Sequence, residues 1–223
     1  MDNRSAFNVD KYDENVRRVI PFYDEIHRQV ISLIRAYFGD RQLVVLDTGC
    51  GTGTLAAKAF EGLQIAEMTL CDPSETMLTA SKEKLKGFNC TFICKGSEEL
   101  DFESCFDVVT AIQSHHYFDR ARREHAVRNC YNALKPGGLL ICFENTAPFS
   151  ETGKEIMLKR LETYERNAGR PEDEIKQHSQ RYDREFFPIS LKEHMELLEK
   201  TGFKICELLW HSYMQSGFYA IRN

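Results

Sequence analysis

Five short runs of apolar residues follow one another along the chain, at residues 43–46, 68–71, 91–94, 106–111 and 138–143. Their apolar positions are continuous rather than alternating, which is typical of strands that are covered on both faces. Amphipathic stretches of helical period fill the gaps, at residues 54–61, 74–85 and 120–134. Because strand and helix alternate, the pattern predicts an α/β fold in which right-handed crossovers build a doubly wound, mostly parallel sheet.

The two ends of the chain depart from this alternation. Apolar residues recur at helical spacing over residues 11–38, but Pro21 interrupts them, so we expect two helical pieces there. Residues 151–168 are polar and helical, which indicates an inserted cap. The chain finishes with a helix and two β-like runs whose short separation permits an antiparallel pair, at residues 191–200, 203–210 and 216–221.

Length and composition fit one domain with a core of its own. The chain has 223 residues, of which 42% are hydrophobic and 28% charged, and these fractions are typical of a globular protein. Within a single domain over residues 1–223 we expect a helical N-terminal lid, a core of alternating strands and helices, a helical cap, and a C-terminal helix with a hairpin that completes the sheet, at residues 1–40, 41–149, 150–190 and 191–223.

A glycine-rich turn, Asp47-Thr48-Gly49-Cys50-Gly51-Thr52-Gly53, follows the first buried strand and opens a helix. Doubly wound sheets bind ligands at this end of their strands, and glycine lets a ligand approach where a Cβ would obstruct it. The third glycine lies four residues after the first, whereas a dinucleotide fingerprint needs five. Asp72 ends the next strand, where a carboxylate can accept hydrogen bonds from both ribose hydroxyls, although a helix-capping role is the alternative. The pattern predicts a nucleoside site.

Through these motifs the chain resembles class I S-adenosylmethionine-dependent methyltransferases over residues 43–143, especially the branch of carboxy-S-adenosylmethionine synthase and related small methyltransferases. The resemblance implies a Rossmann-like, seven-stranded sheet whose last strand is antiparallel. It also implies S-adenosylmethionine as cofactor and S-adenosylhomocysteine as product. Asp47, Gly49 and Gly51 would then flank the methionine portion of the cofactor, and Asp72 would hold its ribose.

Two further segments would complete the cofactor site on this resemblance. Residues 18–23 resemble a segment that closes over the cofactor, while the alternative for Tyr23 is a half-buried place in a helix kinked at Pro21. The turn after the third strand would flank the adenine, and because family members often have Asp where Gly96 stands, the hydroxyl and backbone of Ser97 would substitute. The residues expected to bind the cofactor are Arg18, Tyr23, Asp47, Gly49, Cys50, Gly51, Gly53, Asp72, Pro73, Met77, Gly96, Ser97, Glu98 and Gln113.

Methyl transfer from a sulfonium is an in-line displacement, in which a protein aligns the acceptor, excludes water and, for a weak nucleophile, removes a proton. His115 and His116 directly follow the fourth strand, and either can act as a base because histidine titrates near neutrality. The alternative is a packing or positioning role for both. Glu144 ends the fifth strand and is the third catalytic candidate, unless it is only a solvated strand end.

The cap around residues 177–184 mixes arginine with imidazole, amide and hydroxyl groups, which suits a polar or anionic acceptor because guanidinium pairs well with carboxylate or phosphate. A charged surface helix is the alternative. The residues expected to bind the acceptor are Tyr117, Asn145, His178, Arg181 and Tyr182.

The net charge, the cysteines and the hydropathy pattern limit which partners and which compartment are expected. A formal charge of −5 argues against a large nucleic-acid footprint, although it leaves a tRNA partner open. There is no signal-peptide h-region and no apolar run near the roughly 18 residues of a membrane span, so we expect a cytoplasmic protein without a membrane partner. No metal site is expected, because neither CxxC pairs nor HExxH occur. A homodimer is compatible with the sequence. The cysteines expected to pack as reduced, small hydrophobes are Cys71, Cys94, Cys142 and Cys206.

Several functions fit these features. The leading hypothesis is an S-adenosylmethionine-dependent methyltransferase acting on a small molecule. The second is a carboxy-S-adenosylmethionine-type enzyme linked to tRNA wobble-uridine modification; that branch holds the extra carboxylate with a cap arginine, but a gap-free match from Ile175 places Ser179 there, with Arg181 and Arg184 out of register. The third is a non-catalytic nucleoside-binding protein, since fold alone does not prove chemistry. The glycine spacing disfavours an NAD-linked oxidoreductase.

Overall fold

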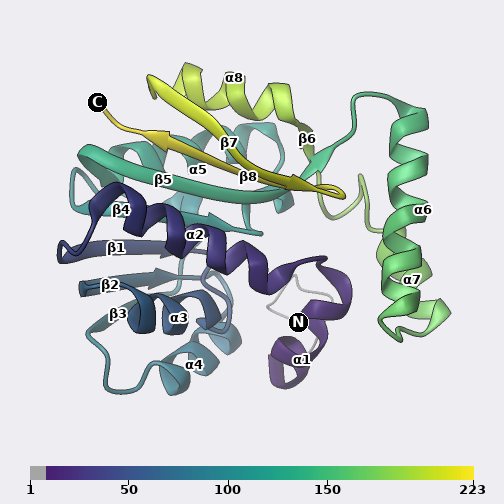
Figure 1. Ribbon diagram of the computed structural model, residues 1–223, viewed down its shortest axis with the longest axis horizontal. Helices are drawn as coiled ribbons and strands as arrows, with labels where there is room; N and C mark the ends of the chain where they lie inside the picture. The colour runs from purple at the N-terminus through teal and green to yellow at the C-terminus, as the bar shows by residue number, and fades with distance from the viewer. Residues whose placement is uncertain (1–8) are drawn as a thin grey trace.

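The described part of the chain, residues 9–223 of the computed structural model, is built around one mixed sheet (Figure 1). The first eight residues of the predicted lid lie outside it. The strands are β1 (Leu43–Thr48), β2 (Ile65–Cys71), β3 (Cys90–Ile93), β4 (Phe106–Ile112), β5 (Leu134–Ala147), β6 (Ile189–Ser190), β7 (Ile205–Ser212) and β8 (Gln215–Ile221). The helices are α1 (Tyr12–Val19), α2 (Tyr23–Phe38), α3 (Thr54–Gly62), α4 (Glu75–Lys84), α5 (Arg120–Ala133), α6 (Glu151–Asn167), α7 (Glu172–Ser179) and α8 (Leu191–Thr201).

The strand order is β3-β2-β1-β4-β5-β8-β7, and the five strands from β3 to β5 in this order run parallel. β8 is antiparallel to both β5 and β7. The prediction of a doubly wound, mostly parallel seven-stranded sheet with an antiparallel last strand is therefore confirmed. The short strand β6 pairs with β5 off this path and was not predicted. Its two residues are too few to give a sequence pattern.

β5 begins earlier than the apolar run at residues 138–143 that predicted it. The strand already begins at Leu134, directly after α5, and its register with β4 shifts before Leu139. Gly137 has φ +75° in this segment, and Arg222 pairs with it: the Arg222 N–H donates to the Gly138 carbonyl at 3.0 Å, while the Gly137 N–H donates to the Arg222 carbonyl at 2.6 Å. The last residues of the chain thus hold this glycine segment against the sheet.

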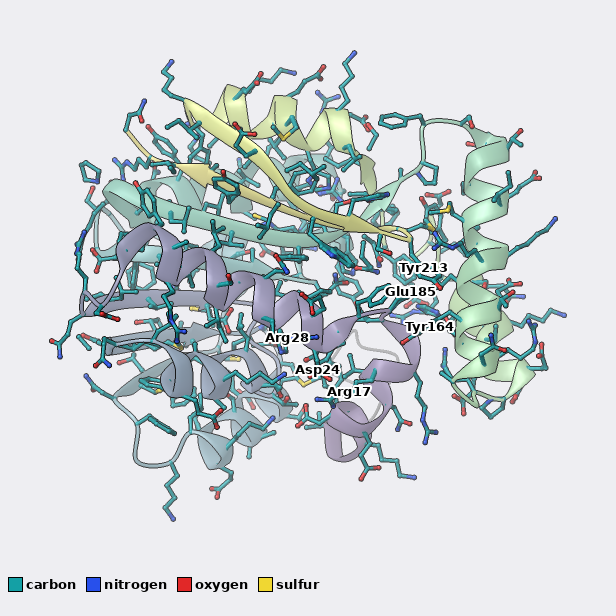
Figure 2. The ribbon with its side chains drawn as sticks, viewed as in Figure 1. Arg17, Asp24, Arg28, Tyr164, Glu185 and Tyr213 are labelled. Carbon is teal, nitrogen blue, oxygen red and sulfur yellow. The ribbon has the colours of Figure 1, made fainter. Side chains whose placement is uncertain are left out.

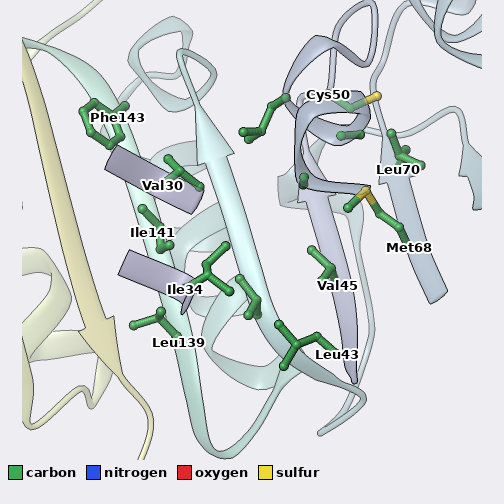
Figure 3. Packing of buried hydrophobic residues seen from close by; sticks show 14 of the residues in the cluster. Val30, Ile34, Leu43, Val45, Cys50, Met68, Leu70, Leu139, Ile141 and Phe143 are labelled. Atoms are coloured by element: carbon green, nitrogen blue, oxygen red, sulfur yellow. The ribbon is translucent and has the colours of Figure 1, made fainter. Parts of the chain in front are cut away.

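Helices cover both faces of the sheet. α2, α3 and α4 pack on one face, where Val30 and Ile34 of α2 lie against Leu139, Ile141 and Phe143 of β5 (Figure 3). α5 and α8 pack on the opposite face. The two faces explain why the strands are continuously apolar: successive side chains of one strand enter different cores.

The break at Pro21 is confirmed, since α1 ends at Val19 and α2 begins at Tyr23. α6 and α7 stand beside the sheet, past the end of β5 (Figure 1). The hydroxyl of Tyr164 on α6 donates to the carbonyl of Arg17 on α1 at 2.7 Å. Arg17 also donates from Nε to Asp24 at 2.7 Å, next to the α1–α2 junction (Figure 2). α1 is therefore connected to the cap on one side and to α2 on the other.

Candidate active site

The glycine turn lies at the carboxyl end of β1, as predicted, and is fixed by the neighbouring strand. The N–H groups of Gly49 and Cys50 both donate to the Cys71 carbonyl of β2, at 2.7 and 2.9 Å. Gly49 has φ +71°, and a Cβ there would lie 2.5 Å from the Cβ of Ser114. Gly51 has φ +55°, but a Cβ there would meet nothing within 4 Å. The first glycine is thus required by packing, whereas the second faces open space that a ligand can use.

Asp72 orders this turn in addition to facing the cavity. Its Oδ2 accepts from the Gly51 N–H and its Oδ1 from the Ser74 N–H, both at 2.9 Å. Asp72 does not cap α4, because Ser74 is the N-cap and its hydroxyl accepts from the Met77 N–H at 3.2 Å, so the helix-capping alternative is wrong. The two contacts of Asp72 are compatible with the ribose-binding hypothesis, because a carboxylate offers about four lone-pair sites.

A cavity of about 310 Å³ lies over the turn, and we call it the cofactor cavity. It brings together most of the residues predicted to bind the cofactor, namely Gly49, Gly51, Asp72, Pro73, Met77, Gly96, Ser97, Glu98 and Gln113. A smaller cavity of about 40 Å³ adjoins it and is lined by Tyr23, Asp47 and Cys50 together with the same glycines. Two predicted residues are not brought to either cavity. Arg18 is exposed on α1, and Gly53 instead allows α3 to approach α4, because a Cβ there would lie 2.5 Å from Ser81 Oγ.

Asp47 is a buried carboxyl beside the smaller cavity. Burial raises its pKa to about 7, with a further contribution from the negative charge of Asp72, although the hydroxyl of Thr110 donates to Asp47 Oδ1 at 2.6 Å and works in the opposite direction. A cationic group placed here, such as an ammonium, would stabilise the ionised form.

Residues 96–100 were predicted to flank the adenine, with the Ser97 hydroxyl as the hydrogen-bonding group. The Ser97 hydroxyl pairs with Nε2 of His115 at 3.0 Å inside the protein. Glu98 covers Gly96, so that a Cβ at Gly96 would overlap its carboxylate. One carboxylate oxygen of Glu98 pairs with Arg122, and the other is buried without a hydrogen-bond partner among the residues described. Glu98 therefore has a carboxylate oxygen that can accept a hydrogen bond from a ligand at this end of the cofactor cavity, whereas the Ser97 hydroxyl is already paired.

The sequence patterns missed two residues at the start of α1. Tyr12 lines the cofactor cavity, the smaller cavity beside it and a third cavity described below. The carboxylate of the next residue, Asp13, accepts from Thr52 Oγ1 at 2.7 Å, Thr54 Oγ1 at 3.0 Å and Lys84 Nζ at 2.6 Å. Helical periodicity predicts α1 but not where it docks, so no local signal marked these positions.

The third cavity, which we call the acceptor cavity, measures about 80 Å³ and lies between the sheet edge, α1 and the cap. All five residues predicted to bind the acceptor line it: Tyr117, Asn145, His178, Arg181 and Tyr182. Three lining residues, Tyr12, Gln113 and Tyr117, are shared with the cofactor cavity. The acceptor cavity has an apolar side as well, formed by Val16, Val19, Ile20, Leu158, Leu161 and Met214.

Of the three catalytic candidates, only His116 lines the acceptor cavity. Its Nδ1 pairs with Glu144 Oε2 at 2.9 Å, and its backbone N–H donates to the same oxygen at 2.9 Å. Glu144 is only 1% exposed, so the alternative of a solvated strand end is wrong. Burial alone would raise the pKa of Glu144, but the hydrogen bond and charge of His116 hold it below its usual value.

His115 has a positioning role in the structure. Its ring pairs with Ser97, its N–H donates to Glu144 at 3.2 Å, and it stacks against Phe118. Burial lowers its pKa, which keeps the ring neutral. His115 and Glu144 lie outside the lining of the cavities, because the turn after β4 points one histidine inward and the carboxyl end of β5 places Glu144 beneath it. A sequence of two adjacent histidines does not reveal which one faces the cavity.

The cap contributes a second histidine–glutamate pair that the sequence did not suggest. His178 Nδ1 lies 2.6 Å from Glu165 Oε1, and the other oxygen of Glu165 pairs with Arg170. Phe186, also missed, is buried at the centre of the cavity wall. Four rings lie around it with centroids 5.9 to 6.2 Å away, those of His116, Tyr117, His178 and Tyr182.

Residues 9–223 contain no group of three or more His, Cys, Asp or Glu placed to hold a metal ion. Within the same residues, no helix combines the length and apolarity needed to cross a membrane. Cys94 is exposed, so the expectation that it packs as a small hydrophobe is wrong; it lies just past the end of β3, where the chain leaves the sheet.

Part of the chain matches a known protein family, and most of it aligns with curated relatives. Residues 45–138 match a family model described as a methyltransferase domain. The carboxy-S-adenosyl-L-methionine synthase of Trichodesmium erythraeum (strain IMS101) is 27% identical over 226 residues, covering 98% of this chain and 88% of the relative. The protein of the same name from Helicobacter pylori (strain Shi470) is 29% identical over 211 residues, covering 89% and 85%.

A solved structure shares the fold over almost the whole chain. It is the Burkholderia thailandensis 1,6-didemethyltoxoflavin-N1-methyltransferase, solved with 1,6-didemethyltoxoflavin and S-adenosylhomocysteine bound. The two chains superpose with a TM-score of 0.64 at 18% identity, and the match covers 96% of this chain and 85% of the other. At this identity the likeness shows the fold, and the residues of the site must be judged on their own geometry.

Proposed function

We propose that this chain, which contains a class I S-adenosylmethionine-dependent methyltransferase domain and is distantly homologous to carboxy-S-adenosyl-L-methionine synthases, transfers a methyl group to a small-molecule acceptor. The observation that carries this proposal is the pair of adjoining cavities. The cofactor cavity and the acceptor cavity share the lining residues Tyr12, Gln113 and Tyr117. A methyl group passing from one cavity to the other would pass between these side chains, shielded from bulk water.

The residues of the cofactor cavity fit S-adenosylmethionine. When bound, this cofactor supplies an electrophilic methyl group on a sulfonium. Gly51 leaves open space for close approach, Asp72 provides a buried carboxylate for the ribose hydroxyls, and Glu98 provides an unpaired carboxylate oxygen for the adenine amino group. Asp47 and Tyr23 lie at the far side of the glycine turn, where the carboxyl group suits the methionine ammonium.

We assign the general base to His116. The Nδ1–Glu144 pair fixes the ring and leaves Nε2 as the nitrogen that accepts the acceptor's proton while the new bond to the methyl group forms. Glu144 would stabilise the resulting imidazolium, as a buried carboxylate does for a histidine base. His115 holds Glu144 through its backbone N–H and is a positioning residue.

The similarity to carboxy-S-adenosyl-L-methionine synthases supports a second candidate, a carboxylated S-adenosylmethionine as ligand. In the cap, however, the Ser179 hydroxyl donates to Glu162 at 2.8 Å, so the position matched to the carboxylate-holding arginine carries a hydroxyl paired with an acid. Arg181 lines the acceptor cavity and is the cap arginine best placed to take over that role.

Calorimetric titration with S-adenosylmethionine, S-adenosylhomocysteine and NAD tests the proposal, together with mass spectrometry of any nucleoside that co-purifies. Micromolar binding of the first two ligands and release of the plain cofactor would support methyl transfer. A released species heavier by one carboxyl group would favour the second candidate. Failure of every adenosyl compound to bind would overturn both.

A further inference from the structure

The charged groups around the acceptor cavity are distributed unevenly. Among the described residues that line it, Arg181 carries the permanent positive charge and no aspartate or glutamate is present. The two nearest buried carboxylates lie behind the lining. Glu144 accepts from His115 and His116, and Glu165 pairs with Arg170 and His178. Neither carboxylate is therefore presented to a bound molecule, and the cavity offers one cation to it.

Arg181 is mostly buried, interacts with the Tyr117 side chain and forms an ion pair with Glu185. Its side chain is 14% exposed, and its guanidinium lies 5.3 Å from the centroid of Phe186. Its Nε pairs at 2.7 Å with Glu185, whose side chain is 58% exposed. Because Glu185 is largely solvated, this contact does not prevent the guanidinium from binding an anion in the cavity.

Tyr182 is a second polar residue on the same wall. The hydroxyl of Tyr182 is buried and makes no hydrogen bond with the residues described. Burial raises the pKa of Tyr182, so the hydroxyl keeps its proton and remains a donor. A buried donor without an acceptor costs about 1 to 3 kcal/mol, a cost that a ligand oxygen would remove.

The remaining lining residues indicate the chemistry of the other parts of the ligand. Leucine, isoleucine, valine and methionine side chains line one side, and His116 lies on the sheet side. A volume of about 80 Å³ restricts the occupant to a small molecule. Phe186 contacts His116, His178, Arg181 and Tyr182 at once, so these groups surround a single binding space.

We infer that the methyl acceptor is a small organic acid, whose anionic group is held by Arg181 and Tyr182 on the cap side and whose nucleophilic group lies beside His116. This inference rests on the proposed methyltransferase function. The apolar side of the cavity would hold the carbon skeleton between the two polar ends. Charge on the ligand, rather than size alone, then decides which molecules are accepted.

Matched acids and amides test the inference, because each pair differs in charge but little in shape. The probes are 2-, 3- and 4-hydroxybenzoate and 3-hydroxybutyrate, each compared with its amide by calorimetric titration of the protein saturated with S-adenosylhomocysteine. At least one acid should bind 10-fold or more tightly than its amide. Equal or tighter binding of every amide, or no binding by any acid, would overturn the inference.

Variants of the cap residues test which side chains bind the anionic group of the ligand. Arg181→Gln should bring the affinities of acid and amide to within threefold of each other, and Tyr182→Phe should weaken the acid severalfold. Arg184→Gln is the matched control, since Arg184 belongs to the same cap segment but is exposed and lies outside the cavity lining. Thermal unfolding of each variant separates a local effect from loss of the fold. A preference for acids that survives in Arg181→Gln contradicts the inference.

Failure of the function and failure of this inference give different results. If S-adenosylhomocysteine does not bind, the proposed function fails, and the acid–amide comparison is carried out on the protein alone. If both ligands bind but S-adenosylmethionine gives no methylated acid, the methyl-transfer proposal fails while the anion site stands.

Discussion

Replacing Gly49 and Gly51 separately by alanine should affect two different properties, although the two residues lie in one turn. Both have positive φ, which costs an alanine about 1 to 2 kcal/mol. At Gly49 the new Cβ would also lie 2.5 Å from the Cβ of Ser114, a contact that real Cβ atoms do not make. Overpacking of this kind adds about 1 to 3 kcal/mol. Gly49→Ala should therefore lower the free energy of unfolding by roughly 2 to 5 kcal/mol.

Gly51→Ala should lose only the backbone cost of about 1 to 2 kcal/mol, because no atom lies within 4 Å of its new Cβ. The open space belongs to the cofactor cavity and the smaller cavity beside it. The methyl group should therefore obstruct the ligand and weaken S-adenosylhomocysteine binding at least 30-fold, which is about 2 kcal/mol. Urea unfolding and calorimetric titration measure the two quantities. Normal ligand affinity in Gly51→Ala would refute the placement of the cofactor on this turn.

Three further changes test other parts of the site. His116→Gln should lower turnover about 100-fold while S-adenosylhomocysteine affinity stays within threefold, and unchanged turnover would remove the base from the mechanism. Burial lowers the pKa of His194 from 6.5 to about 4, so the unfolded chain binds the extra proton between these pH values. Stability should then fall as the pH drops from 6.5 to 4, by up to about 1.4 kcal/mol per pH unit for this group, and urea unfolding of His194→Phe should show a shallower pH dependence. Asp13→Asn weakens the contacts of α1 with Thr52, Thr54 and Lys84 and should speed dissociation of S-adenosylhomocysteine about 10-fold, measured by stopped-flow competition. The exposed neighbour substitution Glu14→Gln is its control, and equal rates in both variants would contradict a closing role for α1.

The sheet and most helices were predictable because their signals are local. Continuous apolar runs require two covering layers, and Pro21 cannot continue a helix. Because β1 and β2 are parallel neighbours, the glycine turn after β1 and Asp72 after β2 lie at the same edge of the sheet. Errors occurred where distant segments decide the local path. Arg222 pairs with Gly137 and Gly138 at the start of β5, although it lies more than 80 residues further along the chain. No window of sequence around Pro136 contains that information.

The candidate site was predictable only in part for the same reason. The predicted strand ends put His116, Glu144 and the glycine turn at one edge of the sheet. They did not predict the direction in which each side chain points. Tyr12 reaches the cavities because α1 docks on the helix after the glycine turn through Asp13. Phe186 enters the acceptor cavity from the cap segment after α7. Packing between elements set these positions, and a single sequence carries no direct signal for it.

The two histidine–glutamate pairs explain why the acceptor cavity presents imidazoles and one arginine. A buried carboxylate is tolerated only with partners that replace its hydration. Glu144 obtains them from the histidine turn itself, whereas Glu165 needs Arg170 as well as His178. In both places the carboxylate is hydrogen-bonded behind the cavity wall and does not face the bound molecule, so the wall presents polar rings to it. The positive charge of Arg181 then acts on the bound molecule from a mostly buried side chain, where electrostatic attraction is stronger than at the surface.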